Sequence, residues 1–256
     1  MKIGVCATSA KAAIVKELGY DYIEENLSAI QKMTDESFRE VQKLYETLDL
    51  PVYSFNNFFP GTITLYGEDS LETIRAYAEV ALDRAQALGG KVCVFGSGKA
   101  RNIGEGVDRA FAEQRFLDVL GLCGEMADKR GILIAVEPLN KNETNYINTV
   151  TDGASVARKL GMANVGGLVD FYHFFMENEP DSNLFDAKDT LLHAHLARPN
   201  ADRLPPKAED VETLAHWADL LKKINYKGAL SIECRFGTEL ESLLSEATPF
   251  VQVFRK

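Results

Sequence analysis

The chain has 256 residues, of which 46% are hydrophobic and 26% charged, a balance typical of a folded globular protein and not of a disordered or collagen-like chain. Its net charge of −10 argues against a surface that collects phosphates, so nucleic acid is not an expected partner. The four cysteines are scattered, and the sequence has neither a basic leader nor ~18 consecutive apolar residues. We expect a soluble cytoplasmic protein with reduced thiols and no membrane contact.

Short β-rich runs alternate with longer segments of helical periodicity from one end of the chain to the other. Strands are expected near residues 2–7, 20–25, 51–56, 91–96, 132–138, 164–170, 190–196 and 228–234. Between them, apolar residues recur every three or four positions, as in Ile74, Tyr77 and Ala81, which predicts amphipathic helices. Glycines such as Gly89 and Gly161 follow these segments, where a helix commonly ends.

This alternation predicts a parallel sheet, because a parallel strand needs a crossover connection that a helix usually supplies. Eight such units in a chain of this length favour an α/β fold of the (β/α)8 barrel type, the TIM barrel, which typically needs about 250 residues. No linker or low-complexity tract divides the chain, so we expect a single domain over residues 1–256. An open doubly wound sheet is the alternative.

Four of the expected strands end in acidic or imidazole side chains. They are Glu137, Asp170, His195 and Glu233. Active sites of (β/α)8 barrels lie at the C-terminal ends of the strands, so these side chains are expected to converge there. Strand alternation supports an inward direction, since it places Ala135, Leu168 and Ser231 one layer beneath the three carboxylates.

Three carboxylates and one imidazole at one place would repel one another unless a cation lay among them. We therefore predict that Glu137, Asp170, His195 and Glu233 bind one divalent metal ion. This ligand set suits Mn²⁺, Co²⁺ or Mg²⁺ by hardness and leaves Zn²⁺ open.

Further polar residues follow the same strands. His173, three residues beyond the predicted aspartate ligand, could point a donor at a substrate hydroxyl, whereas His193 lies one layer below the histidine ligand and is expected to support it. Arg198, Arg203 and Arg235 follow strands seven and eight, where a guanidinium could bind a hydroxyl, a carboxylate or a phosphate.

Seven short segments at the strand ends form a recognisable combination. They are residues 95–98 (FGSG), 136–140 (VEPLN), 143–145 (ETN), 148–149 (NT), 169–173 (VDFYH), 193–195 (HAH) and 231–235 (SIECR). Together they resemble the sugar phosphate isomerase/epimerase family of xylose isomerase-like barrels, and are similar to the ketose 3-epimerases within it. The combination is specific for the superfamily and much less specific for the substrate.

The resemblance implies that the four predicted ligands bind the metal and that two of them, Glu137 and Glu233, also move protons on opposite faces of a metal-stabilised enediolate. It implies substrate contacts at Glu143, at His173 and at an arginine in the loop after strand seven. That loop is longer than the usual spacing, so Arg203 and Arg198 both qualify.

We therefore predict a divalent-metal-dependent isomerase or epimerase of a sugar or sugar phosphate, with a role in carbohydrate metabolism. A dehydratase or lyase acting on a cyclic polyol ketone or keto acid at the same metal site is the alternative. A non-catalytic sugar-binding subunit is an alternative of another class. Endonuclease IV-like repair enzymes share the fold but use a histidine-rich zinc cluster, which four histidines and a net charge of −10 argue against. The resemblance also implies a small carbohydrate as partner and a homo-oligomer, a dimer or tetramer.

Overall fold

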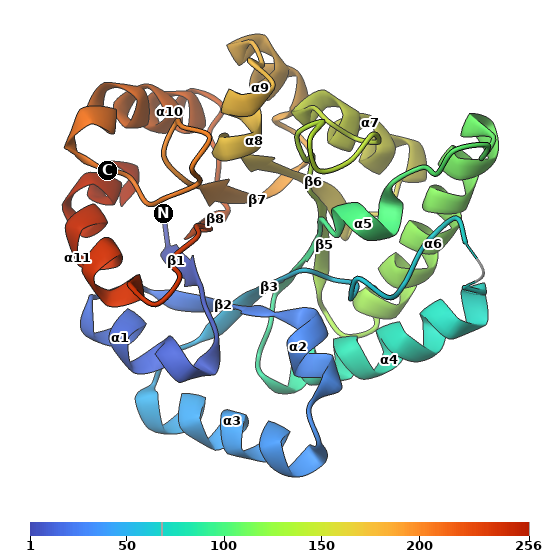
Figure 1. Ribbon diagram of the computed structural model, residues 1–256, viewed down its shortest axis with the longest axis horizontal. Coiled ribbons are helices and arrows are strands. Elements are labelled where there is room, and N and C mark those ends of the chain that lie inside the picture. Colours follow the sequence, from blue (N-terminus) through green and yellow to red (C-terminus); the bar gives the residue numbers. More distant parts are fainter. Residues whose placement is uncertain (68, 256) are drawn as a thin grey trace.

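Eight parallel strands close into a barrel in the computed structural model, which describes residues 1–67 and 69–255 (Figure 1). The strands are β1 (Ile3–Cys6), β2 (Tyr22–Asn26), β3 (Val52–Asn56), β4 (Val92–Phe95), β5 (Leu133–Val136), β6 (Val165–Asp170), β7 (Leu191–Leu196) and β8 (Ala229–Ile232). Each strand pairs with the next one along the chain, and β8 pairs with β1. The predicted single-domain (β/α)8 barrel is confirmed, and the open doubly wound sheet is excluded.

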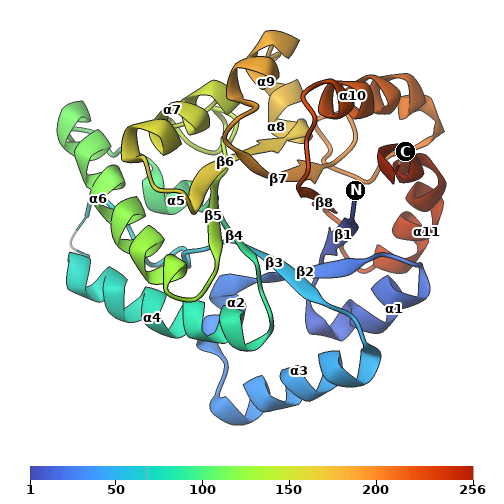
Figure 2. The same cartoon turned by 180° about the vertical axis from the view of Figure 1, so that it is seen from behind.

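Helices form a ring around the barrel, which both face-on views show (Figures 1 and 2). They are α1 (Ala12–Glu17), α2 (Leu27–Lys32), α3 (Asp35–Leu48), α4 (Leu71–Ala87), α5 (Gly98–Arg101), α6 (Arg109–Asp128), α7 (Val150–Leu160), α8 (Phe171–Met176), α9 (Asp181–Ala187), α10 (Val211–Lys223) and α11 (Leu240–Val251). Short 3-10 turns lie at Ser9–Lys11, Ala208–Asp210 and Gln252–Arg255. Within residues 1–67 and 69–255, no helix is long and apolar enough to cross a membrane.

Helix α4 illustrates how local sequence signals produce these elements. The Ser70 side chain accepts a hydrogen bond from the backbone N–H of Thr73 and so caps the first turn. Ile74 and Ala81 are fully buried, as their helical spacing predicts. The helix ends just before Gly89, whose φ of 86° suits glycine far better than any other residue. Capping and periodicity together therefore determine this helix.

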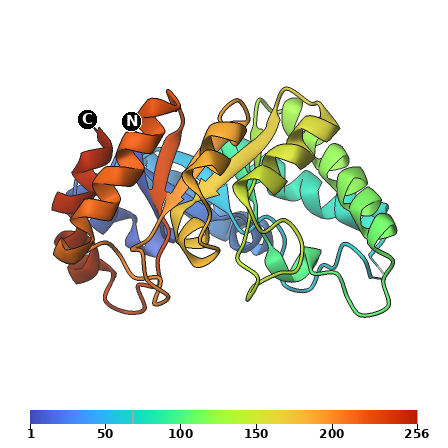
Figure 3. The ribbon, with the colours of Figure 1, turned by 90° about the horizontal axis from the view of Figure 1, so that it is seen from above.

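The apolar core has two layers. A small cluster lies in the barrel interior and contains Val92, Val94, Ala135 and Leu168. The large cluster lies between the strands and the helices, and it includes Val136, the neighbour of Ala135 in β5. The alternation predicted for β5 is therefore observed, and the residue that follows Val136 points into the barrel mouth. Seen from the side, the two termini lie on one face of the barrel and long strand-to-helix loops on the other (Figure 3).

Candidate active site

The structure brings the four predicted metal ligands together at the C-terminal end of the barrel. Glu137 follows β5, Asp170 ends β6, His195 lies in β7 and Glu233 follows β8. One ligand atom from each lies within 4.8 Å of the others. Asp170 and His195 are almost completely buried, and the side chain of Glu233 is 18% exposed. The cluster thus has one open side, next to Glu233.

The His195 ring lies at the centre of the cluster. Its Nδ1 atom is 3.1 Å from Oε1 of Glu137 and 3.3 Å from Oε2 of Glu233. Burial raises the pKa of Glu137, and the nearby charge of Glu233 raises it further. Burial would raise the pKa of Glu233 as well, but the Arg203 guanidinium and the His195 ring outweigh it and hold that pKa below its ordinary value. The two glutamates therefore stand in different electrostatic environments.

Asp170 is oriented by the helix that it starts. Its Oδ1 atom accepts a hydrogen bond of 2.7 Å from the backbone N–H of Tyr172, so it caps α8. Its Oδ2 atom faces the cluster and accepts a hydrogen bond of 3.2 Å from Nη2 of Arg203. The same Nη2 atom pairs with Glu233, and the guanidinium stacks over the Tyr172 ring at 4.8 Å. Arg203 therefore lies at the open side of the cluster and contacts Asp170 and Glu233 there.

The two arginines of the loop after β7 have different surroundings. Arg203 also reaches Glu143, with 3.5 Å between Nη1 and Oε1. Arg198 points elsewhere and is nearly buried, with its Nε atom 3.3 Å from Oδ2 of Asp210 and its Nη2 atom paired with Glu209. The structure thus brings Arg203 and Glu143 to the cluster and leaves Arg198 in an ion-pair network of its own.

His173 is fully buried in the first turn of α8. Its Nδ1 atom accepts a hydrogen bond of 3.0 Å from the backbone N–H of Asn140, so the ring hydrogen of the neutral form is on Nε2. That Nε2 atom lies 3.5 Å from Oδ2 of Asp170 and has no hydrogen-bond partner among the described residues. A buried donor without a partner is rare in proteins, so this N–H has unused hydrogen-bonding capacity next to Asp170.

A cavity of about 310 Å³ opens beside the cluster. Its polar lining includes Thr8, Asn26, Asn56, Glu233 and Arg235. Asn56 Nδ2 donates a hydrogen bond of 2.8 Å to Oε1 of Glu233, which ties the lining to the cluster. Arg235 is exposed at its edge. The cavity is large enough for a small polar ligand.

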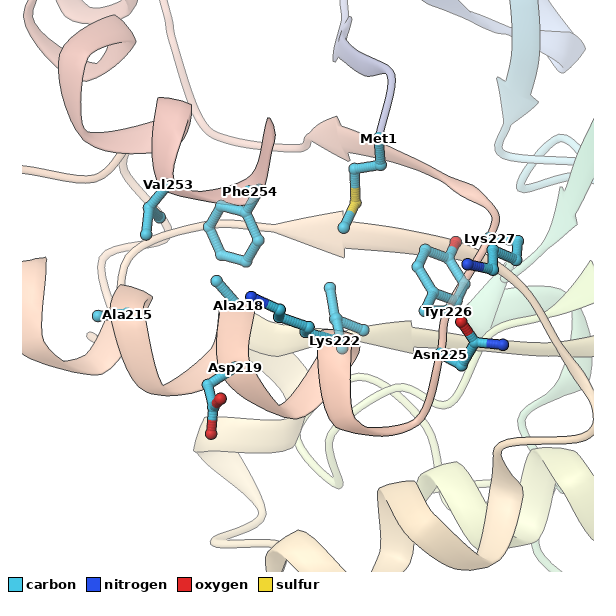
Figure 4. A pocket seen from close by; sticks show the side chains of 11 residues that line it. Met1, Ala215, Ala218, Asp219, Lys222, Asn225, Tyr226, Lys227, Val253 and Phe254 are labelled. Atoms are coloured by element: carbon cyan, nitrogen blue, oxygen red, sulfur yellow. The ribbon is translucent and has the colours of Figure 1, made fainter. Parts of the chain in front are cut away.

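A larger cavity of about 460 Å³ lies on the opposite face of the barrel, beside the N-terminus (Figure 4). Met1 lies between Phe254 and Tyr226 in the lining of this cavity. The charged residues of the lining, such as Lys222 and Lys227, are separate surface side chains. Active sites of (β/α)8 barrels do not lie on that face. The smaller cavity next to the carboxylate cluster is therefore the candidate active site.

Sequence reasoning missed one residue of this region, Glu24 of β2. Its side chain is completely buried between His193 and His195, with hydrogen bonds of 2.8 and 2.9 Å to their Nε2 atoms. Burial would raise the pKa of Glu24, but the two histidines outweigh it and hold that pKa well below its ordinary value. The sequence did contain a signal for this buried carboxylate. Glu24 and Glu25 are adjacent at the end of an apolar strand, so one of them has to face the barrel interior.

The sequence and the fold both have known relatives. Residues 12–250 match the family described as xylose isomerase-like TIM barrel. A putative hydroxypyruvate isomerase from Streptomyces coelicolor is 31% identical over 70% of this chain and 64% of its own length, so this chain spans just under two thirds of that relative. A D-psicose 3-epimerase from Agrobacterium fabrum is 25% identical over 86% of this chain and 76% of its own length.

A third relative, the 3-dehydro-D-guloside 4-epimerase from Escherichia coli, is 25% identical over 90% of this chain and 87% of its own length. Among solved structures, a D-psicose 3-epimerase determined in the presence of D-fructose superposes with a TM-score of 0.86 at 21% identity, with both chains fully covered. These relatives are epimerases and an isomerase, and the structural match has the same closed barrel. The chain therefore belongs to the xylose isomerase-like TIM barrel family.

Proposed function

We propose that the protein is a divalent-metal-dependent isomerase or epimerase that moves a proton at the carbon next to the carbonyl group of a sugar or sugar phosphate. The observation that carries this proposal is the approach of two carboxylates, Glu137 and Glu233, to the same Nδ1 atom of His195 at 3.1 and 3.3 Å. The relatives named above are epimerases and an isomerase, which supports the same class of reaction.

Glu137, Asp170, His195 and Glu233 would hold one divalent cation. Two buried carboxylates, the partly buried carboxylate of Glu233 and one imidazole form an electron-rich donor set that fits such a cation, and Mn²⁺, Co²⁺ and Mg²⁺ suit it by hardness. When bound, the cation supplies Lewis acidity toward a carbonyl oxygen and an adjacent hydroxyl of the substrate. The remaining steps belong to side chains of this protein.

The two glutamates act as the base and the acid of the reaction. They follow β5 and β8, three strands apart around the closed barrel, so they can approach a bound sugar from two sides. One carboxylate removes the proton from the carbon next to the carbonyl, and the other returns a proton on the opposite face, which inverts that carbon. Return of the proton to the neighbouring carbon on the same face gives isomerisation instead.

Three further residues orient the substrate. The Nε2–H of His173 donates to a substrate oxygen, because it lies beside Asp170 of the cluster and has no hydrogen-bond partner among the described residues. Arg203 and Glu143 bind hydroxyl groups on the open side, where their side chains already contact each other. Arg235, at the edge of the cavity, is the remaining candidate for the far end of the substrate, including a phosphate.

The test begins with protein stripped by chelator and reloaded with Mn²⁺, Co²⁺, Mg²⁺ or Zn²⁺ singly. A panel of free and phosphorylated ketoses, hydroxypyruvate and inosose-type ketones is then followed by NMR in D₂O. Wild type is compared with Glu233→Gln and with Glu241→Gln, a matched change at an exposed position of α11. We expect metal-dependent deuterium incorporation next to the carbonyl in wild type and in Glu241→Gln, and its loss in Glu233→Gln.

The product distinguishes the candidate reactions. An epimer or an aldose–ketose pair supports the proposal, whereas loss of water identifies the dehydratase alternative. Equal exchange in Glu233→Gln and wild type would refute the catalytic role of that glutamate. Tight metal binding and sugar binding without any exchange would instead identify a non-catalytic binding protein.

A further inference from the structure

Glu24 lies directly beneath the proposed metal site, on the strand β2. Its Oε1 atom is 2.9 Å from Nε2 of His195, the ring whose other nitrogen faces the carboxylate cluster. Its Oε2 atom is 2.8 Å from Nε2 of His193, one layer deeper in β7. All three side chains are completely buried, although Glu24 also borders the cavity beside the cluster.

The Glu24 carboxylate is also held by hydroxyl groups. Ser54 and Ser231 each donate a hydrogen bond of 2.6 Å to Oε2, from β3 and β8 respectively. Tyr22 lies 2.8 Å from the Ser231 hydroxyl, and it is the donor of that pair because the Ser231 hydrogen is directed to Glu24. With four donors around it, the carboxylate acts only as an acceptor and is fixed in one orientation.

An acceptor at this position determines the tautomer of His195. Because Glu24 accepts at Nε2, the ring hydrogen stays on Nε2 and the Nδ1 lone pair is free to face a cation among the carboxylates. We propose that Glu24 is a positioning residue that holds His195 with Nδ1 directed at the metal ion and that sets its affinity for the ion. This inference rests on the proposed metal site, and it assigns a role to a residue outside the ligand set.

Cys6, Glu24 and His195 also offer ligand atoms within 4.8 Å of one another, so direct ligation of an ion by Glu24 is a competing interpretation. The hydrogen bonds argue against it. Oε2 accepts from three donors and Oε1 already accepts from His195, so at most one lone pair of Oε1 is left for a cation. Glu24 therefore acts through His195.

The chain contains a matched control in the next residue. Glu25 is also buried, at 2% exposure, but it points to the opposite face of β2, where Tyr45 of α3 donates a hydrogen bond to it. Glu24→Gln and Glu25→Gln thus make the same chemical change at adjacent positions, on the two faces of one strand. Only the first change alters the surroundings of His195.

The first experiment measures metal affinity. Chelator-stripped wild type, Glu24→Gln and Glu25→Gln are titrated with Mn²⁺ at pH 7.5 in competition with a fluorescent chelator, after circular dichroism has verified their folding. An amide at position 24 presents one N–H donor where the histidines need an acceptor, so we expect affinity to fall about 10- to 100-fold in Glu24→Gln. Glu25→Gln is expected to bind as wild type does.

The second experiment observes the tautomer directly and needs only wild type. Long-range ¹H–¹⁵N NMR of the Mg²⁺-loaded protein should show hydrogen on Nε2 of His195 and none on Nδ1. Equal Mn²⁺ affinity in Glu24→Gln and wild type would overturn the role of Glu24 while leaving the ligand set intact. Hydrogen on Nδ1 of the loaded protein would overturn that role and would also remove His195 from the ligand set, because a protonated ring nitrogen has no lone pair for a metal ion. If wild type binds no ion at all, the proposed metal site itself fails, and the role of Glu24 fails with it.

Discussion

Replacing Glu25 with glutamine should change how the stability of the protein depends on pH. Burial raises the pKa of Glu25 from an ordinary 4.5 to about 7, although hydrogen bonds from Tyr45 and the backbone act in the opposite direction. The folded protein thus holds this proton more tightly than the unfolded chain does. Its contribution is fully present below pH 4.5, falls as pH rises from 4.5 to 7, and is flat above 7.

The size of this effect follows from the two pKa values. At about 1.36 kcal/mol per pKa unit, the ionisation of Glu25 lowers the free energy of unfolding by about 3 kcal/mol between acid and neutral pH. A glutamine keeps the oxygen that accepts from Tyr45 and cannot ionise. Glu25→Gln should therefore match wild type near pH 4.5 and exceed it by up to about 3 kcal/mol at pH 8.

Urea unfolding in the presence of chelator, at pH 5, 6, 7 and 8, measures this difference without interference from metal binding. Glu46→Gln, an exposed change next to Tyr45, serves as the control and should follow wild type at every pH. Glu179 is buried with a pKa also raised to about 7, so part of the pH dependence should persist in Glu25→Gln. A gap between Glu25→Gln and wild type that is the same at pH 5 and pH 8 would refute the reasoning.

Two further predictions concern the candidate active site. A Cβ atom at Gly96 would lie 1.9 Å from Oε2 of Glu137, so Gly96→Ala should weaken Mn²⁺ binding more than tenfold in chelator competition; unchanged affinity would mean that Glu137 can move aside. Replacement of the two arginines in the loop after β7 should have different effects, one on stability and the other on substrate binding. Arg198→Ala removes a nearly buried partner of Asp210 and should lower the free energy of unfolding by about 3 kcal/mol with KM unchanged, whereas Arg203→Ala should mainly raise KM. A raised KM in Arg198→Ala together with lower stability in Arg203→Ala would contradict these two assignments.

The alternation of strand and helix segments predicted the fold, and the rule that barrel active sites lie at the strand ends predicted the convergence of the four candidate ligands. The periodicity that places Ala135 beneath Glu137 is a local property of β5, and the barrel geometry then brings the strand ends together. Contacts between residues far apart in the sequence could not be predicted from these local patterns. The hydrogen bond from His193 to Glu24 joins residues 169 positions apart, and no spacing in the sequence encodes it.

The tertiary structure also decides which of Arg198 and Arg203 lies at the cluster. The loop after β7 folds back on itself through a hydrogen bond of 3.0 Å from the Arg198 N–H to the carbonyl of Leu204. It also holds Arg203 in the left-handed region at a φ of 54°, which a non-glycine residue rarely adopts. This backbone conformation directs one guanidinium to the cluster, and residue composition gives no indication of it.

The barrel interior is apolar on one side and polar on the other, and this division explains why Glu24 is needed. Val92, Val94, Ala135 and Leu168 form the apolar side on β4–β6, whereas Glu24, Ser54, His193 and Ser231 are buried polar residues of β2, β3, β7 and β8. If the apolar side extended to β2, the buried Nε2–H of His195 would have no acceptor, which costs about 1–3 kcal/mol, and the ring could turn over to find one. Glu24 supplies that acceptor, and the Ser54 and Ser231 hydroxyls in turn donate to its other oxygen, Oε2. A buried histidine that directs one ring nitrogen at a metal site therefore requires a polar partner for the other.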